Sequence, residues 1–322
     1  RYTAMAFHNS DSYEKAGIDT IPQIQGYNVY YGWYGGNVNQ FGNWLDKKHE
    51  SNSDNLLFIS EYGAGSDRRI NAMHPKRFDF SGNWQRHYHE SYIRQIKKRK
   101  YLAGTAIWNQ FDFSQPHTGG SIPKKKKKGM QTWDRKPKDV YYLYKANWNP
   151  DPMVYIASRD WKTRISKSLY DQVTNKTSYS KQPFDVYTNL DSVELFCNGE
   201  SMGIKKTNDI HKATWELELR NGENIILVNG TQNEKLYQDL CKVNCLHLPK
   251  SLTEYFETNN KLAINTGFNA QFIDESGLIW LSDQEYHPGN YGYIGGKPEM
   301  IQKAMIVCKR GATKTVYNSY LS

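Results

Sequence analysis

Residues 56–65 read LLFISEYGAG, and the rest of the chain is most easily understood from this segment. The apolar run Leu56–Ile59 is too short for a helix and predicts a strand buried on both faces, as in a parallel sheet. Glu61 follows at the end of that strand, before a loop that contains glycine. Active sites of parallel α/β barrels lie at the carboxyl ends of the strands, so Glu61 is a candidate catalytic carboxylate. The alternative is a Glu61 that only caps the next segment.

Alternating strands and helices extend from this segment through residues 1–149. Apolar runs predict strands, and aromatic and aliphatic residues at helical spacing predict helices between them. The predicted strands are Arg1–Phe7, Ile21–Tyr30, Leu56–Ser60 and Tyr101–Trp108, and the predicted helices are Gln40–Lys48 and Trp84–Lys98. This pattern predicts an α/β unit. Since four strands do not close an eight-stranded parallel barrel, we expect further barrel strands upstream.

From about Pro150 onward the pattern changes to strands and turns. The predicted strands are Met153–Trp161, Phe184–Thr188, Ser192–Cys197, Thr214–Arg220 and Ile225–Asn229. Asn221-Gly222 follows a clean alternation of apolar and polar residues and predicts a hairpin turn. The sequence therefore predicts an all-β unit over residues 150–248, a linker over residues 249–261 and a further small β module over residues 262–322.

Composition and charge limit the classes of function. The 322 residues carry a net charge of +9, but five of the cations form one run, Lys124–Lys128. A nucleic-acid-binding protein distributes its basic residues over a face, so we expect no nucleic-acid partner and a solvated loop at this run. No apolar run reaches the ~18 residues of a membrane span. Four Cys are too few for a disulfide scaffold, and Cys197 shares a strand face with apolar residues, which favours a core thiol.

Aromatic residues make up 14% of the chain, and several follow the predicted strands. Residues 26–36 read GYNVYYGWYGG and include Tyr30, while Trp108 ends the last strand of the α/β unit. Aromatic rings stack on the apolar faces of sugars, and glycines let a loop approach a ligand closely. Core packing explains any one of these residues. Three strand ends that bring Glu61, Tyr30 and Trp108 to one rim predict a carbohydrate site.

These motifs resemble glycoside hydrolase family 2, the family of β-galactosidases and β-glucuronidases. The matching segments are NVYYGWY from Asn28, ISEYG from Ile59, WN from Trp108, FDF from Phe111, KGM from Lys128 and DRKPK from Asp134. DVYTNLDSVELFCNG from Asp185 resembles the immunoglobulin-like sandwich of that family, and Ile264–Gly296 resembles the start of a malectin-like module. The resemblance implies the C-terminal half of a (β/α)8 TIM barrel, followed by an immunoglobulin-like β-sandwich and a partial malectin-like β module.

The resemblance also implies roles for single residues. Glu61 matches the nucleophile of a retaining hydrolase, and Tyr30 matches the tyrosine that hydrogen-bonds it. Trp108 matches a residue that shapes the glycone subsite, and Asn28 and Tyr34 are candidates for contacts with sugar hydroxyls or the rim. A retaining mechanism needs a second carboxyl group roughly 5 Å from the first. The family places that acid/base Glu at the fourth barrel strand, so we expect it upstream and expect negligible hydrolysis by these residues alone.

The identity of the sugar depends on the lysine run. Glucuronidases of the family carry Asn-x-Lys where this chain has Lys126-Lys127-Lys128, so Lys128 matches the pattern and Lys126 departs from it. Galactosidases also keep a lysine at this place, and the accompanying β domains favour a β-galactosidase that removes terminal β-galactosyl residues. The alternatives are a β-glucuronidase on the same scaffold and a non-catalytic carbohydrate-binding protein.

The sequence predicts no cofactor and no metal ligands, and it leaves a bound cation open. His74, His87 and His89 lack the spacing of metal ligands and are expected in ordinary hydrogen bonds. Asp67-Arg68-Arg69 is expected in a solvated loop, and Asp112 is expected to pair with a cation or to brace its loop. The expected partner is a β-linked oligosaccharide or polysaccharide. Oligomeric state and compartment stay open, although the accessory domains favour a periplasmic or secreted protein by analogy.

Overall fold

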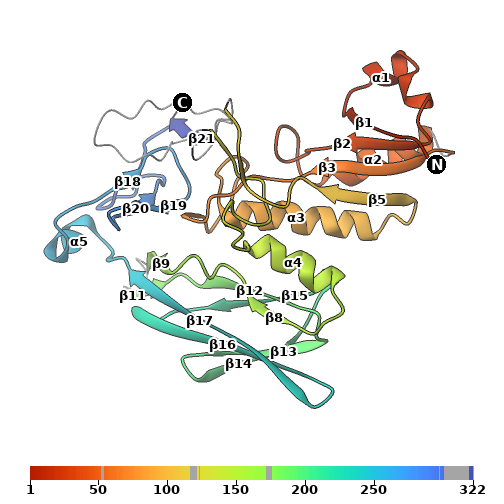
Figure 1. Ribbon diagram of the computed structural model, residues 1–322. Coiled ribbons are helices and arrows are strands. Elements are labelled where there is room, and N and C mark those ends of the chain that lie inside the picture. Colours follow the sequence, from red (N-terminus) through yellow and green to blue (C-terminus); the bar gives the residue numbers. More distant parts are fainter. Residues whose placement is uncertain are drawn as a thin grey trace.

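The computed structural model shows three units that follow one another along the chain (Figure 1). An α/β unit comes first, a unit of two β-sheets follows it, and a smaller β unit comes last. The structure describes residues 1–51, 54–116, 122, 124–171, 176–296, 298–300 and 319–321. Among the helices in these ranges, none is both long and apolar enough to cross a membrane.

The α/β unit is built on a parallel sheet with the strand order β1-β2-β3-β5. Its strands are β1 (Ala4–His8), β2 (Ile24–Asn28), β3 (Leu56–Tyr62) and β5 (Leu102–Ile107). Its helices are α1 (Ser12–Lys15), the 3-10 helix η1 (Ile18–Thr20), α2 (Gln40–Ser51), α3 (Gly82–Lys97) and α4 (Asp139–Trp148). The four predicted strands and the two predicted helices are confirmed, with ends that differ by no more than three residues.

The helices and the sheet of this unit share one apolar core. Tyr27 and Ile59 on the central strands, Phe41 on α2 and Tyr92 on α3 are all buried in it. The rings of Phe41 and Tyr92 stack with their centroids 4.0 Å apart, which holds α2 against α3. Strands β1 and β5, at the edges of the sheet, stay partly or fully exposed along most of their length. Closure of the sheet into a barrel stays a prediction.

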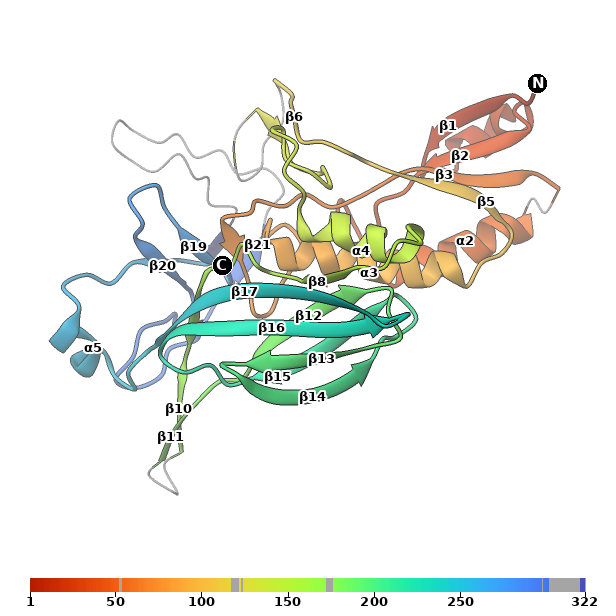
Figure 2. The ribbon, with the colours of Figure 1, turned by 60° about the horizontal axis from the view of Figure 1, so that its bottom comes forward.

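The second unit packs a sheet of order β15-β12-β8 on a sheet of order β14-β13-β16-β17-β9 (Figure 2). The strands are β8 (Val154–Ile156), β9 (Thr163–Ser166), β12 (Gln182–Thr188), β13 (Ser192–Cys197), β14 (Glu200–Lys206), β15 (Lys212–Leu217), β16 (Gly222–Gln232) and β17 (Lys235–His247). Phe184 and Trp215 from one sheet and Leu195 and Val228 from the other lie in one core. Cys197 is a buried free thiol in that core, as predicted. A separate hairpin joins β10 (Ser168–Asp171) to β11 (Lys176–Tyr179).

The predicted hairpin turn at Asn221-Gly222 is wrong. Strand β15 before it lies in the three-stranded sheet and β16 after it lies in the five-stranded sheet, so the chain crosses between sheets here. Gly222 has a φ of +91°, and the Asn221 side chain accepts a hydrogen bond from the backbone N–H of His247. The hairpin turns of this unit are Asn198-Gly199 and Asn233-Glu234, whose φ angles are all positive. A local Asn-Gly signal does not show which sheet the next strand joins.

Buried ion pairs join helix α3 to the second unit. Nη1 of Arg86 lies 3.0 Å from Oδ2 of Asp185 on β12. One turn along α3, Glu90 accepts a hydrogen bond of 2.6 Å from the hydroxyl of Tyr187 and pairs with Lys212 at 2.8 Å. These side chains are largely withdrawn from water, so each charge depends on its partner for stabilisation. The ion pairs therefore fix how α3 packs against the second unit.

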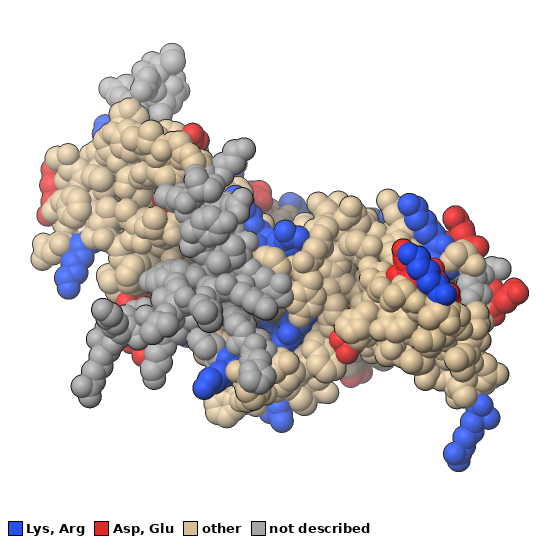
Figure 3. Space-filling model, turned by 90° about the horizontal axis from the view of Figure 1, so that it is seen from above, with Lys and Arg blue, Asp and Glu red and all other residues tan. Residues whose placement is uncertain are grey.

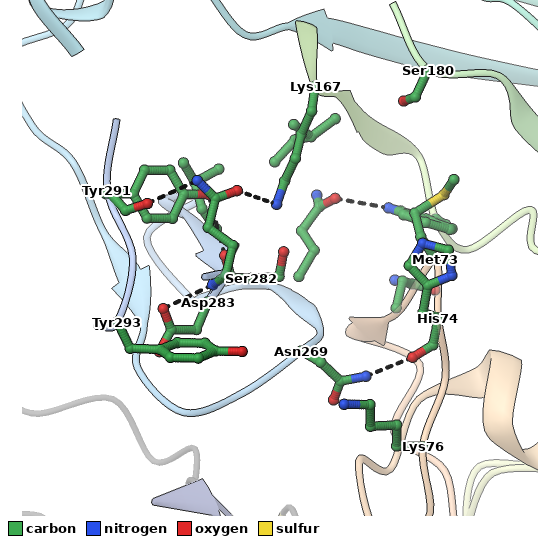
Figure 4. A pocket seen from close by; sticks show the side chains of 16 residues that line it. Met73, His74, Lys76, Lys167, Ser180, Asn269, Ser282, Asp283, Tyr291 and Tyr293 are labelled. Carbon is green, nitrogen blue, oxygen red and sulfur yellow. Dashed lines mark hydrogen bonds between the residues drawn. The ribbon is translucent and has the colours of Figure 1, made fainter. Parts of the chain in front are cut away.

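The third unit is anchored to the first by strand pairing. It contains helix α5 (Leu252–Thr258), which lies inside the predicted linker, and β18 (Ile264–Asn265), β19 (Gln271–Ile273), β20 (Ile279–Ser282), β21 (Pro298–Met300) and β22 (Ser319–Leu321). Strand β19 pairs with β4 (Ile70–Asn71), which lies in the loop after β3. The three units together line a cavity of about 420 Å³, with Met73, Lys167 and Tyr293 each contributed by a different unit (Figure 4). The malectin-like nature of the third unit stays a prediction.

Candidate active site

The carboxylate of Glu61 lies near the C-terminal end of β3, where it meets a tyrosine from the neighbouring strand. Tyr30, two residues beyond β2, donates a hydrogen bond of 2.7 Å to Oε2 of Glu61. Burial raises the pKa of the Tyr30 phenol, and the hydrogen bond to Glu61 raises it further. The phenol therefore stays protonated and acts as a permanent donor that orients the carboxylate.

The parallel register between β2 and β3 explains this contact. Asn28 lies opposite Glu61 in the ladder, after an irregularity next to Tyr27. The backbone N–H of Val29 donates to the Glu61 carbonyl at 2.8 Å. The Asn28 side chain accepts a hydrogen bond of 2.8 Å from the hydroxyl of Ser60. Asn28 is therefore at the strand end that the sequence predicts, with its amide oxygen already engaged.

Trp108 reaches the same rim from the end of β5. Its backbone N–H donates to the Tyr62 carbonyl at 2.8 Å, its peptide bond to Asn109 is cis, and its ring packs edge-on against Phe113. Gly63 permits the close approach of the two strands, because a Cβ at this position would lie 2.1 Å from the Trp108 carbonyl oxygen. The three strand ends that the sequence singles out therefore meet at one rim.

Two lysines flank the aromatic rings at this rim. Nζ of Lys128 lies 3.5 Å from the ring centroid of Tyr30 and 4.1 Å from that of Tyr34, within the range of cation–π attraction. Nζ of Lys126 donates a hydrogen bond of 3.0 Å to the Tyr34 hydroxyl. The Tyr30 and Tyr34 rings meet edge to face with centroids 5.0 Å apart. Tyr34 is exposed, and both ammonium groups lie within cation–π range of its ring, at 5.7 Å for Lys126 and 4.1 Å for Lys128.

Lys128 occupies an unusual position for an ammonium group. The residue is only 2% exposed, and its Nζ has no hydrogen-bond partner among the described residues. Burial lowers the pKa of Lys128 well below its ordinary value, and Lys126 lowers it further, whereas Glu61 acts in the opposite direction. A buried ammonium without an acceptor is costly, so this position suits an anionic or hydrogen-bond-accepting group of a ligand.

The solvated loop predicted at the Lys124–Lys128 run is wrong. Residues Lys125–Lys126 form strand β7, which pairs with β6 (Phe113–Ser114). The reason is local geometry, because the alternation of an extended segment sends neighbouring lysines to opposite sides. Lys126 and Lys128 reach the tyrosines of the site, and Lys125 and Lys127 face the other way, toward Trp133 and Asp67.

The solvated loop predicted at residues 67–69 is also wrong. Asp67 is buried, and its carboxylate accepts hydrogen bonds from Arg69 at 2.8 Å and from Lys127 at 2.7 Å. Burial alone would raise the pKa of Asp67, but the two cations reverse the effect and lower it. The carboxylate stays ionised and ties the loop after β3 to the lysine run.

A second buried ion pair, Asp112 with Lys138, lies beside the loop after β3. Asp112 accepts hydrogen bonds from Nζ of Lys138 at 2.8 Å and from the backbone N–H of Gly129 at 2.9 Å. The carboxylate thus both pairs with a cation and braces the loop, as predicted. Burial lowers the pKa of Lys138 to about 8, with Asp112 opposing that change. Lys138 and the role of Asp67 were not predicted from the sequence, because neither residue belongs to a strand end and their contacts are tertiary.

The contacts described here for His74, His87 and His89 are with residues other than Glu61. His89 is fully buried, its Nδ1 lies 2.9 Å from the Tyr144 hydroxyl, and burial lowers its pKa to about 3. His74 lines the cavity of Figure 4, and His87 packs against Trp84. Across the ranges that the structure describes, no group of three or more His, Cys, Asp or Glu is arranged to hold a metal ion.

Comparisons with known proteins agree with the fold and with the motifs. Residues 180–237 match a domain of unknown function, DUF4982. A β-glucuronidase of Bacteroides fragilis is 35% identical over 240 residues, which make up 72% of this chain and 33% of that protein. The solved structure of Bacteroides uniformis β-glucuronidase 2, covalently bound to cyclophellitol-6-carboxylate aziridine, matches with a TM-score of 0.85 at 37% identity, covering 96% of this chain and 36% of that chain. The chain belongs to glycoside hydrolase family 2.

This family 2 chain spans about one third of the length of the β-glucuronidases that it matches. It is also similar to the β-galactosidase BoGH2A of Bacteroides ovatus, at 22% identity over 156 residues that make up 48% of this chain and 17% of that protein. The family resemblance found in the sequence is confirmed. Both activities weighed there occur among the family 2 relatives, with the β-glucuronidases more similar to this chain.

Proposed function

We propose that the full-length protein is a retaining β-glucuronidase in which Glu61 is the nucleophile. The observation that carries this proposal is the buried ammonium of Lys128, which has no hydrogen-bond partner in the described structure and interacts electrostatically with Glu61. A glucuronosyl residue carries a carboxylate that pairs with such an ammonium as a point charge. The neutral hydroxymethyl group of a galactosyl residue offers no compensating charge.

Lys126 strengthens the preference for an acidic sugar. Its ammonium lies near the same Tyr34 ring as that of Lys128, and it lowers the pKa of Lys128. An anion bound near both groups relieves their mutual repulsion and restores the protonated form of Lys128. Lys126 thus supplies a cation where the glucuronidase pattern has an Asn, and the departure adds positive charge to the subsite.

The proposed reaction has two displacements. Ionised Glu61 attacks the anomeric carbon, the bond to the aglycone oxygen breaks as that oxygen takes a proton from a carboxylic acid, and a glycosyl ester forms on Glu61. Water then attacks the same carbon, giving its proton to that carboxylate, and Glu61 is released. Tyr30 holds the Glu61 oxygens in place for the attack, and Trp108 shapes the glycone side. The proton donor remains the Glu that the sequence analysis expects at an earlier strand.

The relatives support the acidic glycone better than the galactosyl preference expected from the sequence. The Bacteroides fragilis relative is named a β-glucuronidase, and the Bacteroides uniformis enzyme is covalently bound to a carboxylate-bearing molecule, cyclophellitol-6-carboxylate aziridine. The Bacteroides ovatus relative keeps a β-galactosidase as the second candidate. The two candidates differ in the charge of the glycone and share Glu61 and Tyr30.

The test compares aryl β-glucuronide and aryl β-galactoside hydrolysis by the full-length protein and its Lys128→Met variant. The glucuronide is expected to be preferred, and Lys128→Met is expected to lower its kcat/KM by roughly 10- to 100-fold, as for loss of a charged hydrogen bond, with little change for the galactoside. Lys125→Met is the control, because that side chain faces away from the tyrosines. A preference for the galactoside in both proteins would establish the second candidate instead.

The nucleophile is tested separately by covalent labelling. The full-length protein is incubated with cyclophellitol-6-carboxylate aziridine, digested and analysed by mass spectrometry. The label is expected on the peptide that contains Glu61 and is expected to be absent from Glu61→Gln. Labelling of another carboxylate would remove Glu61 from the mechanism. No labelling and no turnover of either glycoside would support the non-catalytic carbohydrate-binding alternative.

A further inference from the structure

A second, larger cavity lies behind the lysine run. Its volume is about 680 Å³, and it is lined by the loop after β3, by the segment around Asp112 and by residues 132–138. Lys125 and Lys127 line it, while Lys126 and Lys128 do not. The extended backbone therefore divides the run between two sites, one at the Glu61 rim and one in this cavity.

The walls of this cavity carry an excess of positive charge. Six Lys and Arg side chains line it, against three Asp. One carboxylate, Asp67, serves both Arg69 and Lys127, and its side chain is 2% exposed while those of Arg69 and Lys127 are 31% and 13% exposed. None of the salt bridges among the described residues involves Lys125, which lies over the ring of Trp133. At Asp67 the cations are thus more accessible than the carboxylate, whereas Lys138 and Asp112 are both largely buried, at 4% and 8% exposure.

The cavity also has an exposed aromatic wall. Trp133 is 65% exposed, which is unusual for the largest aromatic side chain, and Nζ of Lys125 lies 5.6 Å from its ring centroid. An exposed indole offers an apolar face to a pyranose ring, and a neighbouring ammonium pairs with a carboxylate or sulfate on the same ring. Figure 3 shows that Lys and Arg side chains gather near the middle of the face seen from above.

We propose that this cavity is a second saccharide-binding site that takes a negatively charged sugar residue, carboxylated or sulfated, stacked on Trp133 and paired with Lys125. This site is separate from the glycone subsite, since the lysine run lies between them. The inference goes beyond the proposed function and does not depend on whether Lys128 recognises a glucuronosyl carboxylate. It gives the full-length protein a binding site for acidic glycans besides its glycone subsite.

The experiment measures binding of a sulfated galactan tetrasaccharide, which contains no β-glucuronosyl residue, and of the same tetrasaccharide without sulfate. Titration calorimetry uses the full-length protein carrying Glu61→Gln, so that hydrolysis does not interfere. The sulfated probe is expected to bind more tightly than the neutral one and to weaken as NaCl is raised from 50 to about 200 mM, because the contacts are ionic. Lys125→Met and Trp133→Ala are each expected to weaken its Kd by roughly 5- to 20-fold.

The chain offers a matched control for these variants. Lys235 also lies over an aromatic ring at the protein surface, that of Tyr237, at 5.3 Å, but it lines none of the cavities described above. Lys235→Met is expected to leave the Kd unchanged. Aryl glucuronide hydrolysis by Lys125→Met and Trp133→Ala, measured without Glu61→Gln, is expected to stay within about twofold of the parent, since their side chains do not reach the tyrosines of the rim.

Three results would overturn the inference. The first is absence of binding of the sulfated probe at millimolar concentration to a protein whose thermal unfolding is normal. The second is equal affinity for the neutral and sulfated probes, and the third is an equal loss in Lys235→Met. If the unmutated full-length protein fails to hydrolyse aryl glucuronide, only the proposed function is contradicted. Failure of the proposed function and failure of the second binding site are therefore distinguishable.

Discussion

The Tyr30 hydroxyl donates to Oε2 of Glu61 at 2.7 Å, across 31 residues and two neighbouring strands. Tyr30→Phe removes this donor and leaves the ring that Lys128 covers. We expect kcat on the preferred aryl glycoside to fall roughly 10- to 100-fold with little change in KM, because a hydrogen bond to a charged group is lost while the subsite keeps its shape. Steady-state kinetics of Tyr30→Phe and of its neighbour Tyr31→Phe measure this. An equal fall in both variants would argue for a general packing effect.

Gly63 is expected to be intolerant of a side chain. A Cβ there would lie 2.1 Å from the Trp108 carbonyl oxygen, so Gly63→Ala must push β3 and β5 apart at the rim. We expect a loss of about 2 kcal/mol or more in the free energy of unfolding, as for other overpacked sites. Gly82→Ala is the control, since nothing lies within 4 Å of the added carbon at the start of α3. Denaturant titration that gave the two variants the same stability would contradict the close approach.

Glu90 joins α3 to the second unit through Tyr187 and Lys212. Glu90→Gln keeps the shape of the side chain and leaves the partly buried ammonium of Lys212 with one charged partner fewer. We expect a destabilisation of about 3 kcal/mol, the order measured when one member of a buried pair is removed. Glu223→Gln breaks a pair with Lys242 in which both side chains are 58% exposed, and should change stability by less than about 1 kcal/mol. Similar values for both would show that the interface is hydrated.

His89 is expected to make stability depend on pH. Its pKa in the folded protein is lowered to about 3, mainly by burial, from an ordinary value of 6.5, so the unfolded chain binds the proton more tightly. Its contribution is therefore fully present above about pH 6.5 and is lost as pH falls toward 3, at up to about 1.4 kcal/mol per pH unit. His89→Gln should flatten the pH dependence of unfolding in this window.

The elements of the α/β unit were predictable because their signals are local. Leu56–Ile59 is an apolar run that a buried parallel strand requires, and α3 shows its buried face at helical spacing. The rim was predictable for the same reason, since Glu61, Tyr30 and Trp108 each follow a recognisable strand. Parallel strands bring their carboxyl ends to one edge, so three local signals together predicted one rim.

What could not be predicted depends on contacts between distant segments. The burial of Lys128 is set by Tyr30 and Tyr34, and the hydrogen bond between Lys126 and Tyr34 joins residues 92 apart. Five consecutive lysines carry no apolar residue that would mark a buried face. Likewise, Asn221-Gly222 has the composition of a hairpin turn, and only the pairing of β16 with β13 and β17 shows that the chain changes sheets.

The division of the lysine run between two faces has a consequence for how this segment can vary. Removing one lysine from the five barely alters the composition or the net charge, and because the residues are identical the product is the same whichever lysine is removed. If Gly129 keeps its place, an ammonium stays over Tyr30 and the gap falls at the start of the run, whereas if the start keeps its place, the glycine moves into the position of Lys128 and the ammonium over Tyr30 is lost. In a stretch of identical residues, only the position along the run, odd or even, distinguishes one lysine from the next.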